Sequence, residues 1–371
     1  MDAGKAEILA YLEGKKQFLI PVYQRPYSWG HEQCERLWND ITALHRDGRK
    51  GHFLGCIVRI LEAKAGDVAK QTIIDGQQRL ATVTVLLAAL RDHIAESGSD
   101  EVRAADITES YLINPRQPGD DRYKLVLGET DQEELRGLVE GFPPRDGPES
   151  RIRANYAYFK VEIAKGDPPP GGIYEAVRKL QIVDVILERD RDEDPQAIFE
   201  SLNSTGQDLA DSDLIRNFVF MSLPPDRMNF VYDNVWRPTE RLFSYGNQTA
   251  LLDNFFRDWL TMQYKQLVNK NDVYGKFTHF AKNIWPDKTE GKDFAKETWA
   301  DKTEGLCRDL SAFAKIHAGM DSGDSGAPEL DSLYGGLKEI RLSVAYPFLM
   351  KASHDRAEGL LTGEELAEIV S

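Results

Sequence analysis

The segment from residue 73 to residue 79 places a carboxylate, two amides and a guanidinium where a strand pattern runs directly into a helix pattern. Asp75 and Gln78 have the spacing of a helix cap, in which side chains accept hydrogen bonds from the amides of the first turn. Gly76 permits the tight turn before the helix. This structural interpretation accounts for Asp75 and Gly76 without any ligand.

Capping does not account for Arg79. A cation in the first turn faces the positive end of the helix dipole, at a cost on the order of tenths of a kcal/mol. A bound anion makes this arrangement favourable, because the amides, the dipole and the guanidinium then all face one phosphate. Gln77 and Gln78 are suited to hold a base or ribose edge, or to orient a water. The turn therefore leaves two interpretations open, a structural cap and a phosphate site.

A second stretch, residues 20–29, interleaves aromatic rings with a glutamine and an arginine, in the order Tyr23, Gln24, Arg25, Tyr27 and Trp29. An arginine between rings can grip a phosphate bidentately, and the rings offer a surface for a base or an apolar modification. The alternative is an edge segment whose rings fill the core and whose arginine forms a structural ion pair. The residues alone do not decide between the two.

A third stretch, residues 195–209, predicts a short helix, a turn and the approach to another helix. Asn203, Thr205 and the loop amides could face a phosphate or a base. Alternatively, Gly206 is a left-handed stop at a helix end and Asn203 is an ordinary residue near it.

The elements that must position these residues follow from the hydrophobic spacing. Residues 1–95 predict a short helix near residues 8–12, an extended segment at 18–29, a helix at 34–44, strands at 52–62 and 71–75, and a long amphipathic helix at 80–94. Helices dominate from residue 96 onward, except that 181–188 is rich in β-branched residues and is expected to add a strand to the N-terminal sheet. We expect an α+β fold, a small mixed sheet with helices followed by a mainly α-helical domain. The expected domains are 1–95, joined by the strand and loop of 181–210, and 96–371.

The composition limits the class of protein. The chain has 371 residues, of which 41% are apolar and 29% charged, and this is the profile of a soluble protein with two domains. A net charge of −15 excludes a protein that coats DNA indiscriminately, since that mode of binding needs an excess of lysine and arginine. No apolar run could cross a bilayer, so a cytoplasmic location is expected. The spacing of Cys34, Cys56 and Cys307 does not suit zinc, and we expect three buried thiols and no metal site.

Four blocks of the chain together resemble the signature blocks of the GmrS-like restriction NTPases, including the SspE type. In order they are IPVYQRPYSW, HFLGCIV, IIDGQQRLAT and IFESLNSTGQDLADSDLIRN, and RIRANYAYF at 151–159 is similar to a further block of these proteins. Relatives are ParB/sulfiredoxin-like domains that are usually fused to a C-terminal HNH nuclease. The resemblance covers residues 19–221. One departure is Ala81, at a position where many relatives have threonine.

The resemblance implies a nucleotide site and a function in restriction of phage DNA. Relatives hydrolyse nucleoside triphosphates, often with GTP favoured, and respond to DNA modification such as phosphorothioate. The implied partners are therefore a nucleoside triphosphate, modified DNA and an attached HNH nuclease domain, and Mg²⁺ and a homodimer are compatible with this function. The implied site consists of Gln24, Arg25, Asp75, Gly76, Gln77, Gln78 and Arg79, with Asn203, Thr205 and Gly206 facing the same cleft.

The expected mechanism rests on positioning and charge stabilisation, which is most of what phosphoryl transfer requires of a protein. Arg79 and Arg25 bind the phosphates, and Gln77 or Gln78 positions the attacking water. Asp75 orients one of these side chains or a metal ion. A P-loop is absent from the sequence. A separate expectation is that Tyr23, Tyr27 and Trp29 form a surface that helps to sense the DNA modification.

Two other functions remain open. The chain could be a nucleotide switch that does not hydrolyse its ligand, or a DNA-binding adaptor for the nuclease, and phosphate release would distinguish them from an NTPase. The seven histidines are scattered and show no His-Asn-His pattern, so no nuclease residues are assigned. We expect the nuclease domain to be missing from this chain, because a capping box formed by Thr362 and Glu365 starts a helix close to Ser371.

Overall fold

The computed structural model describes residues 2–62, 66–98, 102–142, 150–187, 209–284, 294–323 and 343–370, together with residues 198, 331 and 334–336. The chain divides into two compact units, residues 1–202 and residues 203–371. This division differs from the boundary expected at residue 95. The physical reason is that the helices between residues 104 and 178 share the hydrophobic core of the sheet.

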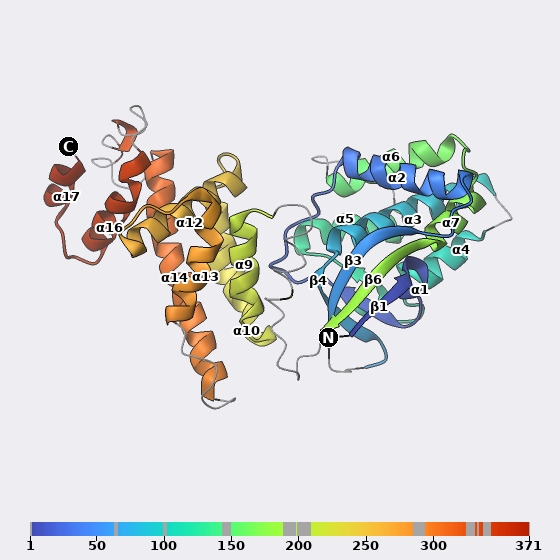
Figure 1. Cartoon of the computed structure of the whole chain (residues 1–371), viewed down its shortest axis with the longest axis horizontal. Coiled ribbons are helices and arrows are strands. Elements are labelled where there is room, and N and C mark those ends of the chain that lie inside the picture. The colour runs from blue at the N-terminus through green and yellow to red at the C-terminus, as the bar shows by residue number, and fades with distance from the viewer. Residues whose placement is uncertain are drawn as a thin grey trace. The chain divides into compact units, whose positions relative to one another are not determined.

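A six-stranded mixed sheet forms the centre of the first unit (Figure 1). Its spatial order is β1-β6-β3-β4-β2-β5. Strand β6 runs parallel to β3 and antiparallel to β1, whereas β3 and β4 are antiparallel, and β2 lies parallel to both β4 and β5. The strands are β1 (Asp2–Glu7), β2 (Lys16–Leu19), β3 (His52–Leu61), β4 (Ala69–Asp75), β5 (Leu125–Val126) and β6 (Leu180–Leu187).

The predicted mixed sheet, followed by a mainly helical region, is confirmed. Strands β3 and β4 lie where the β-branched runs predicted them, and β6 enters the sheet between β1 and β3 as expected for residues 181–188. The spacing did not reveal β1, whose residues are almost all exposed, because a polar edge strand lacks the alternation that marks a half-buried one.

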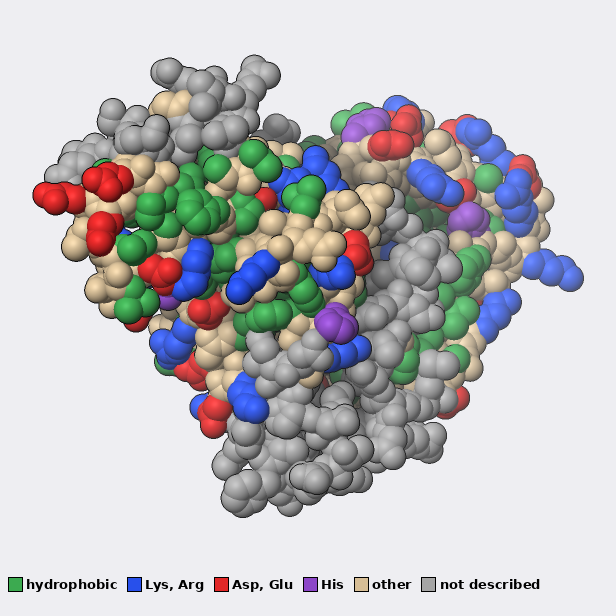
Figure 2. Space-filling model, turned by 60° about the vertical axis from the view of Figure 1, so that its left-hand side comes forward, with side chains coloured by type: hydrophobic (Ala, Val, Ile, Leu, Met, Phe, Trp, Pro, Cys, Tyr) green, Lys and Arg blue, Asp and Glu red, His purple; other side chains and the backbone are tan. Residues whose placement is uncertain are grey.

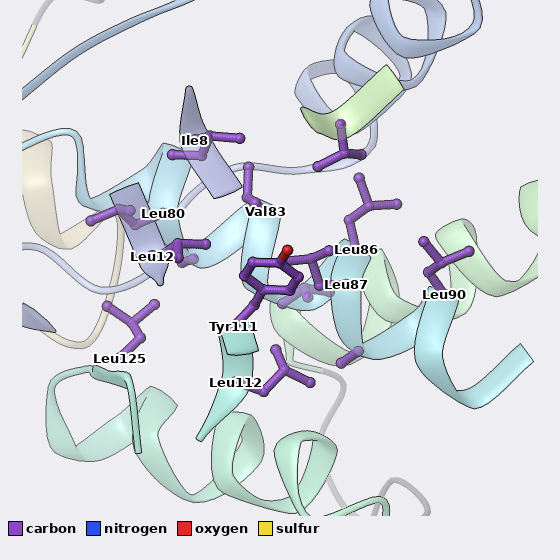
Figure 3. Packing of buried hydrophobic residues seen from close by; sticks show 14 of the residues in the cluster. Ile8, Leu12, Leu80, Val83, Leu86, Leu87, Leu90, Tyr111, Leu112 and Leu125 are labelled. Atoms are coloured by element: carbon purple, nitrogen blue, oxygen red, sulfur yellow. The ribbon is translucent and has the colours of Figure 1, made fainter. Parts of the chain in front are cut away.

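Helix α3 (Gln77–Ser97) is the central helix of the first unit. It was predicted to be amphipathic, but every residue from Leu80 to Leu90 is buried. Side chains of α3 pack there beside Ile8, Leu12, Tyr111, Leu112 and Leu125 (Figure 3). Helices α4 and α6 and strand β5 also contact α3. The remaining helices of this unit are α1 (Ile8–Leu12), α2 (His31–Arg46), α4 (Ala104–Ile107), α5 (Glu129–Val139), α6 (Arg151–Ala164) and α7 (Pro170–Arg178).

The described part of the second unit is helical. Aromatic residues form much of its core, among them Phe220, Trp236, Phe255, Phe256 and Trp259. Its helices are α9 (Asp211–Met221), α10 (Pro225–Val231), α11 (Arg237–Arg241), α12 (Gln248–Tyr264), α13 (Val273–Ile284), α14 (Phe294–Ser322), α16 (Tyr346–Ala357) and α17 (Gly363–Val370). The predicted capping box is present at α17, where Thr362 N donates to Glu365 Oε2 (2.8 Å) and Glu365 N donates to Thr362 Oγ1 (3.2 Å).

Two further predictions concern the membrane and the cysteines. Within the described ranges, no helix combines the length and apolar character needed to cross a bilayer. All three cysteines are free thiols, and Cys34 and Cys307 are buried as expected. Cys56 is partly exposed, so the expectation of three buried thiols is wrong for this residue.

Candidate functional site

The turn between β4 and α3 is made possible by Gly76. Its backbone has φ 91° and ψ 6°, in the left-handed region that side chains other than glycine rarely adopt. A Cβ atom at this position would lie 2.9 Å from the carbonyl oxygen of Cys56 and 2.9 Å from Ile57 Cγ1. The turn therefore packs directly onto β3, and only glycine fits.

The first turn of α3 has no side-chain cap. The N-cap residue is Gly76, and Asp75 accepts no capping hydrogen bond from the helix. Gln78, the other half of the expected capping box, turns its amide away from the helix end. Among the described residues, none accepts a hydrogen bond from the backbone N–H groups of residues 77–79. The interpretation of this turn as a side-chain cap is therefore wrong, and these amides have no partner among the described residues.

Arg79 is held by backbone carbonyls. Its Nε donates to Leu54 O (3.1 Å) and its Nη1 to Cys56 O (3.2 Å). The guanidinium lies against Gly55, where a Cβ atom would stand 2.4 Å from Nε, and β3 shifts its register against β6 at this point. Carbonyl partners fix the orientation of the arginine but do not neutralise its charge.

Among the described residues, the carboxylate that pairs with Arg79 is that of Asp75, with 3.9 Å between Nη1 and Oδ2. The side chain of Arg79 is 27% exposed and that of Asp75 is 28% exposed. The pair is thus loose and open to solvent, unlike the close and buried ion pair that would make Arg79 a purely structural residue. Among the described residues, no acceptor binds Nη2, the third nitrogen of the guanidinium.

The two glutamines that follow Gly76 have different roles. Gln78 Oε1 accepts from Ser28 N (2.8 Å) and Trp29 N (3.3 Å), and its Nε2 donates to Pro26 O (3.3 Å). These bonds hold the backbone of residues 26–29 but leave the second Nε2 hydrogen without a partner among the described residues, so the expectation that Gln78 takes part in catalysis stays untested. Gln77 is only 8% exposed, and its buried Oε1 has no hydrogen-bond partner within the described structure.

Hydrogen bonds on both sides of Arg25 bring it to the same turn. Gln24, the preceding residue, is 8% exposed and donates from Nε2 to Ile74 O (3.1 Å). Pro26, the following residue, accepts from Gln78. Because Ile74 and Gln78 flank the turn at Gly76, the partly exposed Arg25 lies beside the first turn of α3.

The expected aromatic surface is not present as such. Tyr23 is 2% exposed and Tyr27 is 6% exposed, so both rings belong to the interior. This corrects the expectation that they read DNA at a surface, because a buried ring cannot stack on a base. Trp29 is partly exposed and is the ring of this segment that remains accessible.

Three residues that the sequence analysis did not single out also hold this segment. Asp131, in α5, accepts from Tyr27 N (2.7 Å), and burial raises the pKa of its carboxyl group. Arg151 donates to Ser28 O, and Asn155 donates from Nδ2 to Trp29 O (2.9 Å). The sequence did contain a signal for Asn155, namely an asparagine inside a predicted helix. Asparagine is unfavourable there, because its side chain competes for backbone hydrogen bonds unless it is bonded elsewhere.

Four of the five sequence blocks therefore meet at one place. They are the segments around residues 20–29, 52–58, 73–82 and 151–159, which are joined by the hydrogen bonds of Gln78, Arg79 and Asn155. Asn203, Thr205 and Gly206 lie outside the described residues, so the structure does not test their expected place in the site.

Magnesium fits this site only as an ion that is bound mainly through a nucleotide. The described residues contain no group of three or more histidine, cysteine, aspartate or glutamate side chains that could hold a metal ion. Mg²⁺ commonly needs only one or two protein carboxylates in addition to phosphate oxygens and waters. The half-exposed carboxylate of Asp75 meets that requirement.

A separate groove of about 640 Å³ lies along α2 and α6, away from this turn. Its basic residues Arg46 and Lys165 form ion pairs with Asp167 and Glu162, respectively. Cations that are already neutralised offer little to a phosphate. The groove is therefore a poorer candidate for an anion site than the first turn of α3.

The fold and the site define a protein in which a mixed sheet presents the uncapped start of a helix, with an arginine beside it. Residues 8–220 match the family model described as GmrSD restriction endonuclease, N-terminal domain. The match covers more than half of the chain, and the chain therefore belongs to this family, as its sequence blocks predicted. No curated protein matches the chain. Membership in this family makes the chain part of a DNA restriction system, a defence that acts against phage.

Proposed function

We propose that the chain binds and hydrolyses a nucleoside triphosphate, with GTP favoured, at the first turn of α3. One observation carries this proposal: the amides of residues 77–79 have no partner among the described residues, and the arginine next to them is not neutralised. A helix start of this kind attracts an anion through its dipole and its amides. The guanidinium of Arg79 adds a full charge to the same place.

Each residue of the turn has a chemical role in this proposal. The amides and Arg79 bind phosphate oxygens, and Arg25 approaches from the neighbouring segment. Gln77 orients the attacking water, since it is the glutamine whose amide oxygen is still without a partner. Asp75 would hold Mg²⁺, which neutralises phosphate charge when it is bound. Gln24 and Gln78 shape the site by holding the backbone, and Gly76 keeps the turn close to β3.

We further propose that this NTPase is the sensor region of a restriction protein, that it responds to DNA modification such as phosphorothioate, and that it controls an attached HNH nuclease. Among the aromatic residues of the segment, Trp29 is the one accessible for such sensing. Acidic and basic side chains are interspersed over the described part of the face in Figure 2, which argues against a broad electrostatic surface for DNA on that face.

Phosphate release from ATP, GTP, CTP and UTP tests the proposal, with and without phosphorothioate DNA. We expect Arg79→Ala to lower kcat/KM about 100-fold or more, the usual effect of removing a group that stabilises transition-state charge. Arg122→Ala is the matched control, because Arg122 pairs with Glu140 away from the turn. Undiminished turnover by folded Arg79→Ala would refute the assignment. Nucleotide binding without phosphate release would favour the non-hydrolysing switch, and equal stimulation by modified and plain DNA would remove the sensor function.

A further inference from the structure

The backbone of residues 26–29 is held at every position by a side chain from another element. Pro26 O and the N–H groups of Ser28 and Trp29 are bound by Gln78. The N–H of Tyr27 is bound by Asp131, Ser28 O by Arg151 and Trp29 O by Asn155. A segment without regular secondary structure usually relies on water for such groups, so this degree of fixation is unusual.

Asn155 makes two hydrogen bonds to this segment. It lies within α6, is 2% exposed, and donates from Nδ2 to both Trp29 O (2.9 Å) and Tyr27 Oη (2.9 Å). The Tyr27 hydroxyl also shares a hydrogen bond with Thr82 Oγ1 (2.7 Å). Thr82 in turn donates to Gln78 O (2.8 Å).

These bonds form one directed chain from α6 to the start of α3. The amide of Asn155 can only donate at one end and the carbonyl of Gln78 can only accept at the other, and the two hydroxyls between them can each accept one bond and donate the next. The chain ends on Gln78, the residue whose side chain binds residues 26–29. Asn155 thus holds both the aromatic segment and the helix start against each other.

We propose that Asn155 is a positioning residue of the nucleotide site. It acts through Tyr27 and Trp29 and fixes the distance between Arg25 and the first turn of α3, so that both arginines can bind one phosphate chain. Asn155 itself does not touch the nucleotide. This inference rests on the proposed function, because it assigns the segment a ligand that the same function supplies.

A matched control exists in the same unit. Asn114 is 1% exposed and also donates two hydrogen bonds from Nδ2, to Lys16 O (2.9 Å) and Asp121 O (3.0 Å). None of its partners belongs to the turn or to residues 20–29. If Asn155 were only a structural link, its removal and that of Asn114 would have the same consequences.

The experiment compares the wild type, Asn155→Ala, Asn114→Ala and Tyr27→Phe. Hydrogen exchange of the peptide covering residues 24–30 is measured without nucleotide, and GTP turnover is measured over a range of GTP concentrations. We expect both asparagine variants to lower the melting temperature to a similar extent. Only Asn155→Ala should speed exchange in residues 24–30 and raise KM about tenfold with a smaller change in kcat, since it misplaces a group that binds the ground state. Tyr27→Phe keeps the ring and the Trp29 bond, so its effect should be intermediate.

The two proposals fail in different ways. Wild-type protein without GTP turnover would overturn the proposed function, and this inference with it. Wild-type turnover together with equal kinetic constants for Asn155→Ala and Asn114→Ala would overturn this inference alone. Unchanged exchange in residues 24–30 of Asn155→Ala would do the same, even if its turnover fell. Where Asn155→Ala does not fold, the exchange and KM of Tyr27→Phe decide, because that variant breaks the same chain.

Discussion

Two arginines of the matched blocks, Arg79 in the first unit and Arg216 in the second, illustrate opposite uses of a guanidinium. Arg216 is 8% exposed and binds two carboxylates, Glu240 at 2.7 Å and Asp213. Arg79 is more exposed, binds two carbonyls, and has a carboxylate only at 3.9 Å. The first is neutralised within the fold, whereas the second keeps its charge.

The difference shows how an arginine that is neutralised within the fold can be distinguished from one whose charge remains accessible to solvent. A buried guanidinium without carboxylates would be costly, so Arg216 needs both of its partners. Carbonyls orient Arg79 at a solvent-accessible place where its charge costs less. The uncapped helix start beside it adds more positive potential. The same residue type therefore serves stability in one unit and is available for anion binding in the other.

Replacing each arginine by alanine gives the largest expected contrast. Arg216→Ala removes the guanidinium partner of two partly buried carboxylates, Asp213 and Glu240, and should lower the free energy of unfolding by about 3 kcal/mol, since Glu240 still accepts from Trp236 Nε1 (2.8 Å). Arg79→Ala removes two hydrogen bonds to carbonyls and should lower it by about 1–2 kcal/mol. Urea unfolding of both variants measures the difference. Equal losses would mean that Arg79 is as structural as Arg216, and the comparison would not hold.

A pair of glycines sharpens the comparison at the turn itself. Gly66 and Gly76 both have φ +91°, but a Cβ at Gly66 meets no described atom within 4 Å, whereas at Gly76 it meets Cys56 O at 2.9 Å. Gly66→Ala should therefore cost only the left-handed conformation, about 1 kcal/mol. Gly76→Ala should cost about 1–3 kcal/mol more, because β3 must also move.

The same unfolding measurement, combined with GTP turnover, checks this prediction. Gly66→Ala should leave turnover unchanged, and Gly76→Ala should reduce it together with stability, because the amides of the helix start move with the turn. Similar stability losses for the two variants would show that the turn does not pack against β3 as closely as the distances indicate.

Local spacing was sufficient to predict most of the fold. The strands at β3, β4 and β6 and the helices at α1, α2 and α3 carry strong hydrophobic patterns, and their types were confirmed. The division between units could not be predicted, since it depends on which surface the helices α4–α7 cover, and one helix pattern resembles another. The burial of α3 on nearly all sides could not be predicted from the sequence for the same reason.

The residues of the candidate site could be predicted, but the hydrogen bonds among them could not. The stretches containing Arg25, Asp75 and Arg79 were identified from residue types, and the structure brings them together. Residue types could not show that the amide oxygen of Gln78 accepts hydrogen bonds and that of Gln77 does not. The two side chains have the same chemistry and differ only in where they point. Asp131 and Asn155 lie more than a hundred positions from Tyr27 along the chain, at 104 and 128 residues, and long-range hydrogen bonds leave no local pattern.

The smallest expected effect concerns two carboxyl groups, one in each unit, whose pKa values are shifted in opposite directions. In the second unit, burial raises the pKa of Asp253, and the nearby Asp213 raises it further. In the first unit, the hydrogen bond from Arg122 lowers the pKa of Glu140 below its usual value. A raised pKa means that the folded chain holds the proton more tightly than the unfolded chain, and a lowered pKa means the reverse.

The two amide variants Asp253→Asn and Glu140→Gln should therefore show opposite pH dependence in urea unfolding. The stability contributed by Asp253 is complete below its ordinary pKa of 3.8 and is lost as the pH rises through its pKa in the folded chain. The stability of Asp253→Asn relative to the wild type should therefore increase between about pH 4 and pH 7. Its amide oxygen can still accept from Ser212 N, as Asp253 Oδ1 does at 2.8 Å. The contribution of Glu140 is present above 4.5 and is lost as the pH falls through its folded value, so Glu140→Gln should be less stable than the wild type at pH 7 and approach it in acid. The unfolding free energies of the two variants, each relative to the wild type, could instead change in the same direction with pH. That result would show that burial does not dominate at Asp253, and that this carboxylate, like Glu140, is stabilised in its charged form.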